Sequence, residues 1–104
     1  MTKSQFNRIT KWQQKTFPNA TPMSKLNHLA EELIELADAI KKGEQTRDLE
    51  YADCFFLLFG AAAADGMTYS HICEVIEAKF TINKDRQWGT PDENGVVKHI
   101  ERVK

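Results

Sequence analysis

The feature that most constrains the fold is a run from Tyr51 to Ala64 in which Asp53 is the single charged residue. A helix that is apolar on all sides is typical of a protein interior. The longest uncharged part, Cys54 to Ala64, is well short of the roughly 20 residues that a membrane-spanning helix needs. We therefore expect a buried helix in a globular domain, with no membrane partner.

Three further helices are predicted around this run, separated by short breakers that contain proline or glycine. The four together cover about residues 4–16, 22–42, 46–64 and 68–88. Thr21 or Ser24 can cap the second helix and Gly43 can end it, while Thr46 and Thr68 can cap the third and fourth. Short connections favour antiparallel neighbours, which predicts an all-α bundle.

The remaining features fit one small intracellular domain. The 104 residues include 14 Lys and Arg against 15 Asp and Glu, so the basic excess typical of nucleic-acid-binding domains is missing. Two cysteines cannot make a disulfide framework, and the first ten residues contain no apolar secretory segment. We expect a single domain over 1–104, a cytoplasmic location and no nucleic-acid partner. Residues 96–103 are expected as a short strand, a helix or a docked arm.

Acidic residues on the second helix are the first functional signal. Glu31, Glu35 and Asp38 nearly superpose in helical projection, with Glu32 on one flank. The opposite side is predicted to carry an apolar stripe of Leu26, Leu29, Leu33, Leu36 and Ile40. Like charges four residues apart destabilise a helix, so the acidic side is either solvated or holds a cation.

Asp53 favours the second interpretation. Burying a carboxylate costs several kcal/mol unless it is paired or binds a metal. Glu50 shares its helix face three residues earlier, and antiparallel packing could bring both to the acidic side of the second helix. Oxygen ligands without cysteine suit Mg²⁺ or Mn²⁺. The alternative is a buried ion pair with an arginine, for which the candidates are Arg47, Arg86 and Arg102.

A basic segment on the fourth helix complements the acidic one. Lys79, Asn83 and Arg86 are spaced four and three residues apart and would line one stripe. An ammonium, an amide and a forked guanidinium in a row make a plausible phosphate clamp, although an ordinary polar helix end has the same composition.

These residues together resemble a known family. Glu31-Glu32-Leu33-Ile34-Glu35 followed by Glu50-Tyr51-Ala52-Asp53 is similar to the paired acidic signature of the MazG-like all-α nucleoside triphosphate pyrophosphohydrolases. The segment from Lys79 to Gly89 resembles the basic motif of the same superfamily, and residues 95–100 resemble the tail of its dATP/dGTP diphosphohydrolase branch. The resemblance covers roughly Trp12 to Ile100.

The resemblance implies a four-helix MazG-like fold whose active site is completed by forming a homodimer or homotetramer. It implies Mg²⁺-dependent hydrolysis of a nucleoside triphosphate, with purine dGTP or dATP as the expected substrate, to the monophosphate and pyrophosphate. Carried onto this chain, the implied metal ligands are Glu32, Glu35, Glu50 and Asp53. Glu31 would orient or deprotonate the attacking water. The triphosphate would be held by Lys79, Asn83 and Arg86, and the base by Trp12, Gln13 and His28.

Three alternatives remain at this point. One is a non-enzymatic helical interaction module with a wet acidic face. Another is a redox di-metal bundle, which is disfavoured because His28 and His71 precede a glutamate by three residues rather than follow one. The third is a hydrolase of the same fold that acts on a pyrimidine or modified nucleotide.

Overall fold

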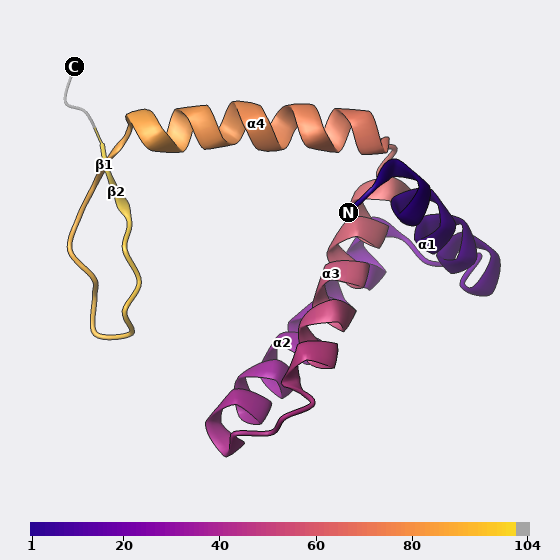
Figure 1. Cartoon of the computed structure of the whole chain (residues 1–104), viewed down its shortest axis with the longest axis horizontal. Helices are drawn as coiled ribbons and strands as arrows, with labels where there is room; N and C mark the ends of the chain where they lie inside the picture. The colour runs from indigo at the N-terminus through magenta and orange to yellow at the C-terminus, as the bar shows by residue number, and fades with distance from the viewer. Residues whose placement is uncertain (102–104) are drawn as a thin grey trace. The chain divides into compact units, whose positions relative to one another are not determined.

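The computed structural model describes residues 1–101, and helices make up most of this length (Figure 1). The elements are α1 (Lys3–Thr16), α2 (Pro22–Lys42), α3 (Arg47–Ala64), α4 (Tyr69–Asp85), β1 (Gln87–Trp88) and β2 (His99–Ile100). The prediction of an all-α chain with four helices is confirmed. Among the described residues, no helix has the length and apolar character needed to cross a membrane.

The contacts divide the chain into two compact units, one of residues 1–72 and the other from residue 73 onward. The first contains α1, α2, α3 and the first turn of α4. The second contains the rest of α4 and the paired strands.

Helix α2 begins and ends where local chemistry predicts. The Thr21 hydroxyl accepts from the Ser24 amide at 3.0 Å, and the Ser24 hydroxyl accepts from the Thr21 amide at 2.9 Å, so the two residues form a reciprocal capping box. Pro22 occupies the first turn, where its missing amide hydrogen costs nothing. Gly43 ends the helix with φ at 67°, a left-handed conformation that glycine adopts without strain.

The other predicted caps have different outcomes. Thr68 accepts from the His71 amide at 3.1 Å at the start of α4. Thr46 stands at the cap position of α3, but its side chain makes no capping hydrogen bond. Asp48 and Glu50 lie in the first turn of α3, where negative charge is favourable against the helix dipole.

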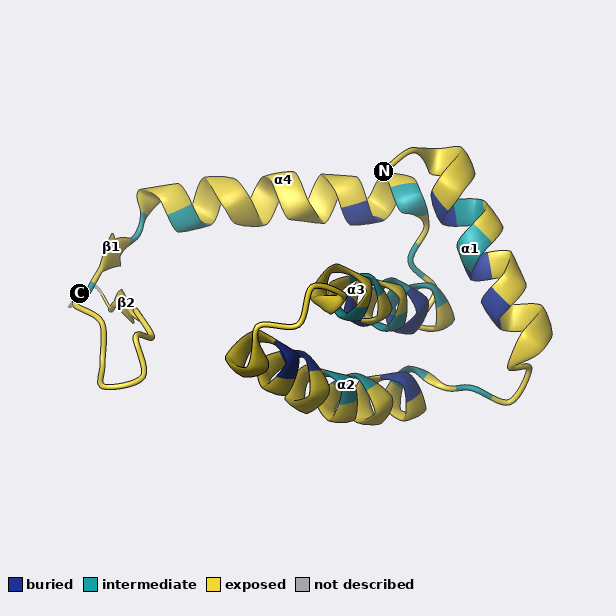
Figure 2. Ribbon diagram, turned by 60° about the horizontal axis from the view of Figure 1, so that its bottom comes forward, coloured by how far each residue is buried: buried dark blue, intermediate teal, exposed yellow. Residues whose placement is uncertain are grey.

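Helices α2 and α3 form an antiparallel pair joined by a short loop, and α1 packs against α3 (Figures 1 and 2). The buried residues of α2 are eleven and three positions apart, which keeps them on one side of the helix: Lys25, Leu36 and Ala39. At the junction of α1 and α3, the Phe6 ring meets the Phe59 ring edge-on, and it also contacts Tyr69. This aromatic contact fixes one end of α1 on the helical pair.

Two predictions about burial are wrong. The predicted apolar stripe of α2 is divided, because Leu36 is buried but Leu26, Leu33 and Ile40 are exposed. Helix α3 is buried only toward α1 and α2, so Phe55 and Leu58 on its other side are exposed as well (Figure 2). The single chain offers α3 too few neighbours to cover an apolar surface that runs all the way round.

Five exposed apolar residues of α2 form a second stripe with a regular spacing of four and three. We call it the outer stripe, and it consists of Leu26, Ala30, Leu33, Ala37 and Ile40. Alternating large and small apolar residues at this spacing are typical of a helix seam that packs against another helix.

The second unit differs from its prediction at the end of α4. The helix was predicted to reach Trp88, but it ends at Asp85, and Trp88 lies in β1. β1 pairs antiparallel with β2, with Trp88 opposite His99. The Trp88 indole N–H also donates to the carbonyl of Asn83 at 2.9 Å. Of the segment predicted as a strand, a helix or an arm, residues 99–100 form a strand, while 102 and 103 lie outside the described residues.

Candidate metal centre and adjoining cavity

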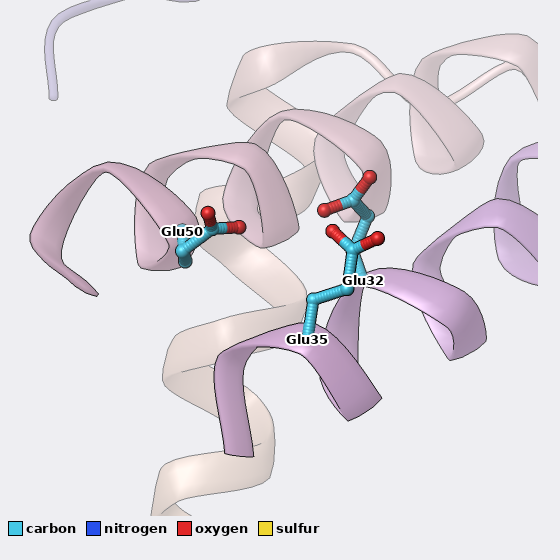
Figure 3. Close-up of side chains that lie close together, drawn as sticks. All are labelled: Glu32, Glu35 and Glu50. Carbon is cyan, nitrogen blue, oxygen red and sulfur yellow. The ribbon is translucent and has the colours of Figure 1, made fainter. Parts of the chain in front are cut away.

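Three carboxylates from two helices meet across the α2–α3 contact (Figure 3). Glu32 and Glu35 lie on α2 and Glu50 lies on α3, and one oxygen from each falls within 4.8 Å of the others. We call these three residues the acidic cluster. Glu32 is four residues before the buried Leu36, so the packing that buries Leu36 also turns Glu32 toward α3.

The electrostatics of the acidic cluster disfavour full ionisation. The pKa of Glu32 is raised above its ordinary value, first because the carboxyl is desolvated and then because of hydrogen bonding and like charge from Glu35. Asp53 adds like charge that also raises this pKa, while His28 opposes the shift. The His28 Nε2 lies 3.1 Å from a Glu32 oxygen, and within residues 1–101 it is the one basic group that contacts the cluster.

The donor set fits a hard divalent cation. It consists of carboxylate oxygens, whose number and closeness suit Mg²⁺ or Mn²⁺ better than a soft metal. Cys54 lies nearby, but burial and the charges of Glu32, Asp53 and Glu50 raise the pKa of its thiol, so it stays protonated. A protonated, buried thiol is a packing group and not a competing ligand.

The sequence argument for Asp53 rested on burial, and that premise is wrong. Asp53 is exposed in this chain. Its charge nevertheless acts on Glu32, and both residues line one cavity. Within the first unit, Arg47 makes no ion pair with Asp53, and Arg86 belongs to the second unit. Arg102 lies outside the described residues.

The other acidic residues of α2 are not part of the cluster. Glu31 is exposed, and its side chain leaves α2 about 100° round the helix axis from that of Glu32. Asp38 pairs with Lys42 on the surface at 2.8 Å. Helical projection predicts that Glu31, Glu35 and Asp38 lie together, with Glu32 on their flank. In the structure, Glu32 and Glu35 are the α2 residues that lie close to Glu50 of α3.

A cavity of about 520 Å³ adjoins the acidic cluster and shares Glu32 with it. The three residues suggested for base binding, Trp12, Gln13 and His28, all line this cavity. Phe17 and Phe56 add aromatic surface, and the Trp12 and Phe17 rings meet edge-on. Its volume lies within the roughly 300–1,000 Å³ of small-molecule pockets.

Gln13 is held in the wall by a close approach of α1 to α3. Its side-chain amide donates to the carbonyl of Phe56 at 2.9 Å, and its exposed fraction is 5%. A Cβ atom on Gly60 would come within 2.7 Å of the Gln13 Oε1, so the absence of a side chain at Gly60 makes room for this amide. Gly60 therefore allows the Gln13 side chain to occupy its place in the wall of the cavity.

The predicted phosphate clamp lies in the second unit. Lys79 is exposed on α4, and Asn83 is partly buried with an occluded Oδ1 that finds no hydrogen-bond partner among the described residues. Arg86 comes after the end of α4, so the three residues do not share one helical stripe as predicted. Arg86 lines a separate cavity with Ile82 and His99.

One charged residue of the cavity was missed by sequence reasoning. Lys25 is buried and lines the cavity between α1 and α2. A signal was present, because a lysine in the first turns of a helix is unfavourable against the helix dipole. That signal alone is too weak to mark a site.

Comparison with known proteins identifies the family of this chain. No curated protein matches the chain. Among solved structures, a MazG-like pyrophosphohydrolase of cyanophage S-2L, bound to dGDP and three catalytic Mn²⁺ ions per active site, is similar at 28% identity. The match covers 97% of this chain and 99% of that chain, with a TM-score of 0.79. The family model for dATP/dGTP pyrophosphohydrolase matches residues 5–103, and the chain therefore belongs to this family of MazG-like deoxynucleoside triphosphate pyrophosphohydrolases.

Proposed function

We propose that the acidic cluster is the metal-binding centre for hydrolysis of a purine deoxynucleoside triphosphate to its monophosphate and pyrophosphate. The observation that carries this proposal is the convergence of Glu32, Glu35 and Glu50 within 4.8 Å. Carboxylates this close repel one another unless a cation lies between them. The cyanophage enzyme, which binds Mn²⁺ and dGDP, supports the same assignment.

The metal ligands on this proposal are Glu32, Glu35 and Glu50, with Asp53 as a fourth donor at the edge of the cavity. Mg²⁺ is the expected ion and Mn²⁺ can replace it, because both take oxygen ligands in similar geometry. When bound, such ions neutralise charge on the triphosphate and acidify the attacking water.

The protein's own groups then position the reactants. Glu31 is exposed and therefore accessible to solvent, and on this proposal it orients the attacking water and accepts its proton. Water attacks the α-phosphorus and the bond to the bridging oxygen breaks, so pyrophosphate leaves. Lys79, Asn83 and Arg86 hold the negative triphosphate and reduce the charge that develops on the leaving group.

The base is proposed to occupy the cavity beside the cluster. Trp12 offers an aromatic face, and Gln13 and His28 offer polar atoms at the wall. Glu32 belongs to both sites, so a nucleotide with its base in the cavity would direct its phosphates toward the metal ligands. A volume of about 520 Å³ accommodates a purine nucleoside.

We further propose that the enzyme is a homo-oligomer, at least a dimer, formed in part through the outer stripe. Leu33, at the middle of this stripe, has an exposed fraction of 50%, and Phe55 on α3 has one of 56%. Large apolar residues exposed in a continuous row mark protein–protein interfaces.

The proposal is tested by incubating the protein with Mg²⁺ or Mn²⁺ and each canonical ribo- and deoxynucleoside triphosphate, then quantifying monophosphate and pyrophosphate. We expect equimolar monophosphate and pyrophosphate, fastest with dGTP or dATP, and no turnover in EDTA. Release of inorganic phosphate in place of pyrophosphate, or faster turnover of pyrimidine substrates, would contradict it.

A further inference from the structure

Lys25 is a largely buried side chain whose charge the proposed reaction does not explain. Its exposed fraction is 8%, and its Nζ lies 5.6 Å from the centre of the Phe17 ring. In the part of the chain that the structure describes, this ammonium makes no ion pair and no hydrogen bond. An ammonium group has three N–H donors, so most of its bonding capacity is unused.

The position of Lys25 is unusual for a lysine. Its stem is buried, whereas its Nζ is not among the occluded polar atoms of the described residues, so the ammonium group stays in contact with the open cavity. The residue is also in the first turns of α2, where the helix dipole repels a cation. The Phe17 ring offsets only part of this cost. A residue that violates local rules in this way is expected to serve a ligand.

The surroundings of Lys25 indicate what that ligand is. It lines the same cavity as Trp12, Phe17 and Phe56, whose rings suit a flat aromatic molecule. Glu32 and Asp53 line the cavity too, beside the acidic cluster. We therefore expect the phosphates of a ligand near these carboxylates, where cations would be bound. The Lys25 ammonium group would then face a neutral part of the ligand, among the aromatic rings of the cavity.

We propose that the Lys25 ammonium donates to the acceptor edge of the purine base, and that it makes the enzyme prefer guanine to adenine. This inference rests on the proposed function. Guanine presents two adjacent acceptors, O6 and N7, which one ammonium group can reach together. Adenine keeps N7 but replaces O6 with an amino donor, which the ammonium group repels. Lys25 is thus a specificity-determining residue for the base.

The test compares dGTP and dATP turnover by the full chain and by Lys25→Met, which keeps the length of the apolar stem and removes the charge. We expect the ratio of kcat/KM for dGTP to that for dATP to fall about tenfold, the effect of losing one hydrogen bond to a charged group. Lys41→Met is the matched control, because it removes an exposed charge from the far end of the same helix. It should leave the ratio unchanged.

Two results would overturn the inference. An equal loss of kcat/KM on both substrates would place Lys25 on the shared triphosphate. An unchanged ratio with unchanged rates would make it a packing residue.

A binding measurement separates this inference from the proposed function. Isothermal titration of dGMP and dAMP in EDTA needs neither metal nor turnover. We expect the protein to bind dGMP more tightly than dAMP and Lys25→Met to lose the difference. This result would support the role of Lys25 even if no triphosphate were hydrolysed. Equal affinity of the unchanged protein for the two nucleotides would overturn it even if hydrolysis were fast.

Discussion

Two faces of α2 are unfavourable within the single chain, one because like charges are close together and the other because apolar side chains are exposed to water. The acidic cluster brings Glu32 and Glu35 against Glu50 although their charges repel, because the neighbouring apolar contacts of α2 and α3 hold the helices together. The outer stripe exposes Leu33 to water although nothing repels it. On the proposed function, the first face binds a cation and the second packs against another copy of the chain. The two roles are then separated by a rotation about the axis of α2.

The largest effect is expected on the acidic cluster. Glu50→Gln keeps the shape of the side chain and removes a ligand charge, so activity with Mg²⁺ should fall by more than the roughly 100-fold typical of outer-shell changes at metal sites. Initial rates of pyrophosphate release measure this. Glu44→Gln in the exposed loop between α2 and α3 is the control and should retain full rate. Normal turnover by Glu50→Gln would show that the acidic cluster is not the metal-binding centre.

The next effect is expected on the outer stripe. Leu33→Glu places a charge in the middle of the proposed interface, where it would be buried without a partner. We expect the oligomer to dissociate to a folded monomer, as measured by sedimentation equilibrium and circular dichroism. Leu33→Met preserves volume and should stay assembled. If Leu33→Glu sediments like the unchanged protein, the stripe is not an interface.

A smaller effect follows from the raised pKa of Glu32. Its folded pKa lies above its ordinary value of 4.5, so the folded state binds more protons than the unfolded state at pH values between the two. Stability of the metal-free protein should therefore decline as pH rises from about 4.5 through the raised pKa. Thermal unfolding in EDTA should show this decline.

The matched variant isolates the charge. Glu32→Gln should flatten this pH dependence and raise the Tm of the metal-free protein by a few degrees at neutral pH, because one repelling charge is gone. The same variant should gain less Tm than the unchanged protein when Mg²⁺ is added. A lower Tm for Glu32→Gln than for the unchanged protein in EDTA would show that the Glu32 carboxylate does not destabilise the metal-free fold.

The smallest effect is expected outside both faces. Asp38 is acidic and on the same helix, but it pairs with Lys42 at the surface. Exposed ion pairs contribute little, so Asp38→Asn should leave both activity and Tm nearly unchanged. Pyrophosphate release and thermal unfolding provide the two measurements. A large loss of activity would show that Asp38 belongs to the functional site together with the acidic cluster.

Local signals were sufficient for the helices but not for their packing. The caps at Thr21 and Gly43 and the start at Thr68 depend on residues three or four positions apart, and these predictions are confirmed. The end of α4 depends on pairing between Trp88 and His99, eleven residues away along the chain. Nothing near Asp85 announces that pairing, so the helix was predicted to be too long.

The site shows the same division. The acidic residues were found because carboxylates in a paired pattern are conspicuous, yet projection alone could not say that Glu32 and not Glu31 faces α3. Asp53 was selected on the premise that α3 is buried, which depends on neighbours that one chain does not supply. Lys25 was missed because its burial arises from α1, which reaches it only through the tertiary fold.

The central claim is that Glu32, Glu35 and Glu50 bind divalent ions. Crystals grown with Mn²⁺ and a non-hydrolysable dGTP analogue, measured at the manganese absorption edge, test it most directly. The account predicts anomalous peaks within coordination distance of carboxylate oxygens from all three residues. A fully occupied nucleotide with no anomalous peak between these carboxylates would contradict it.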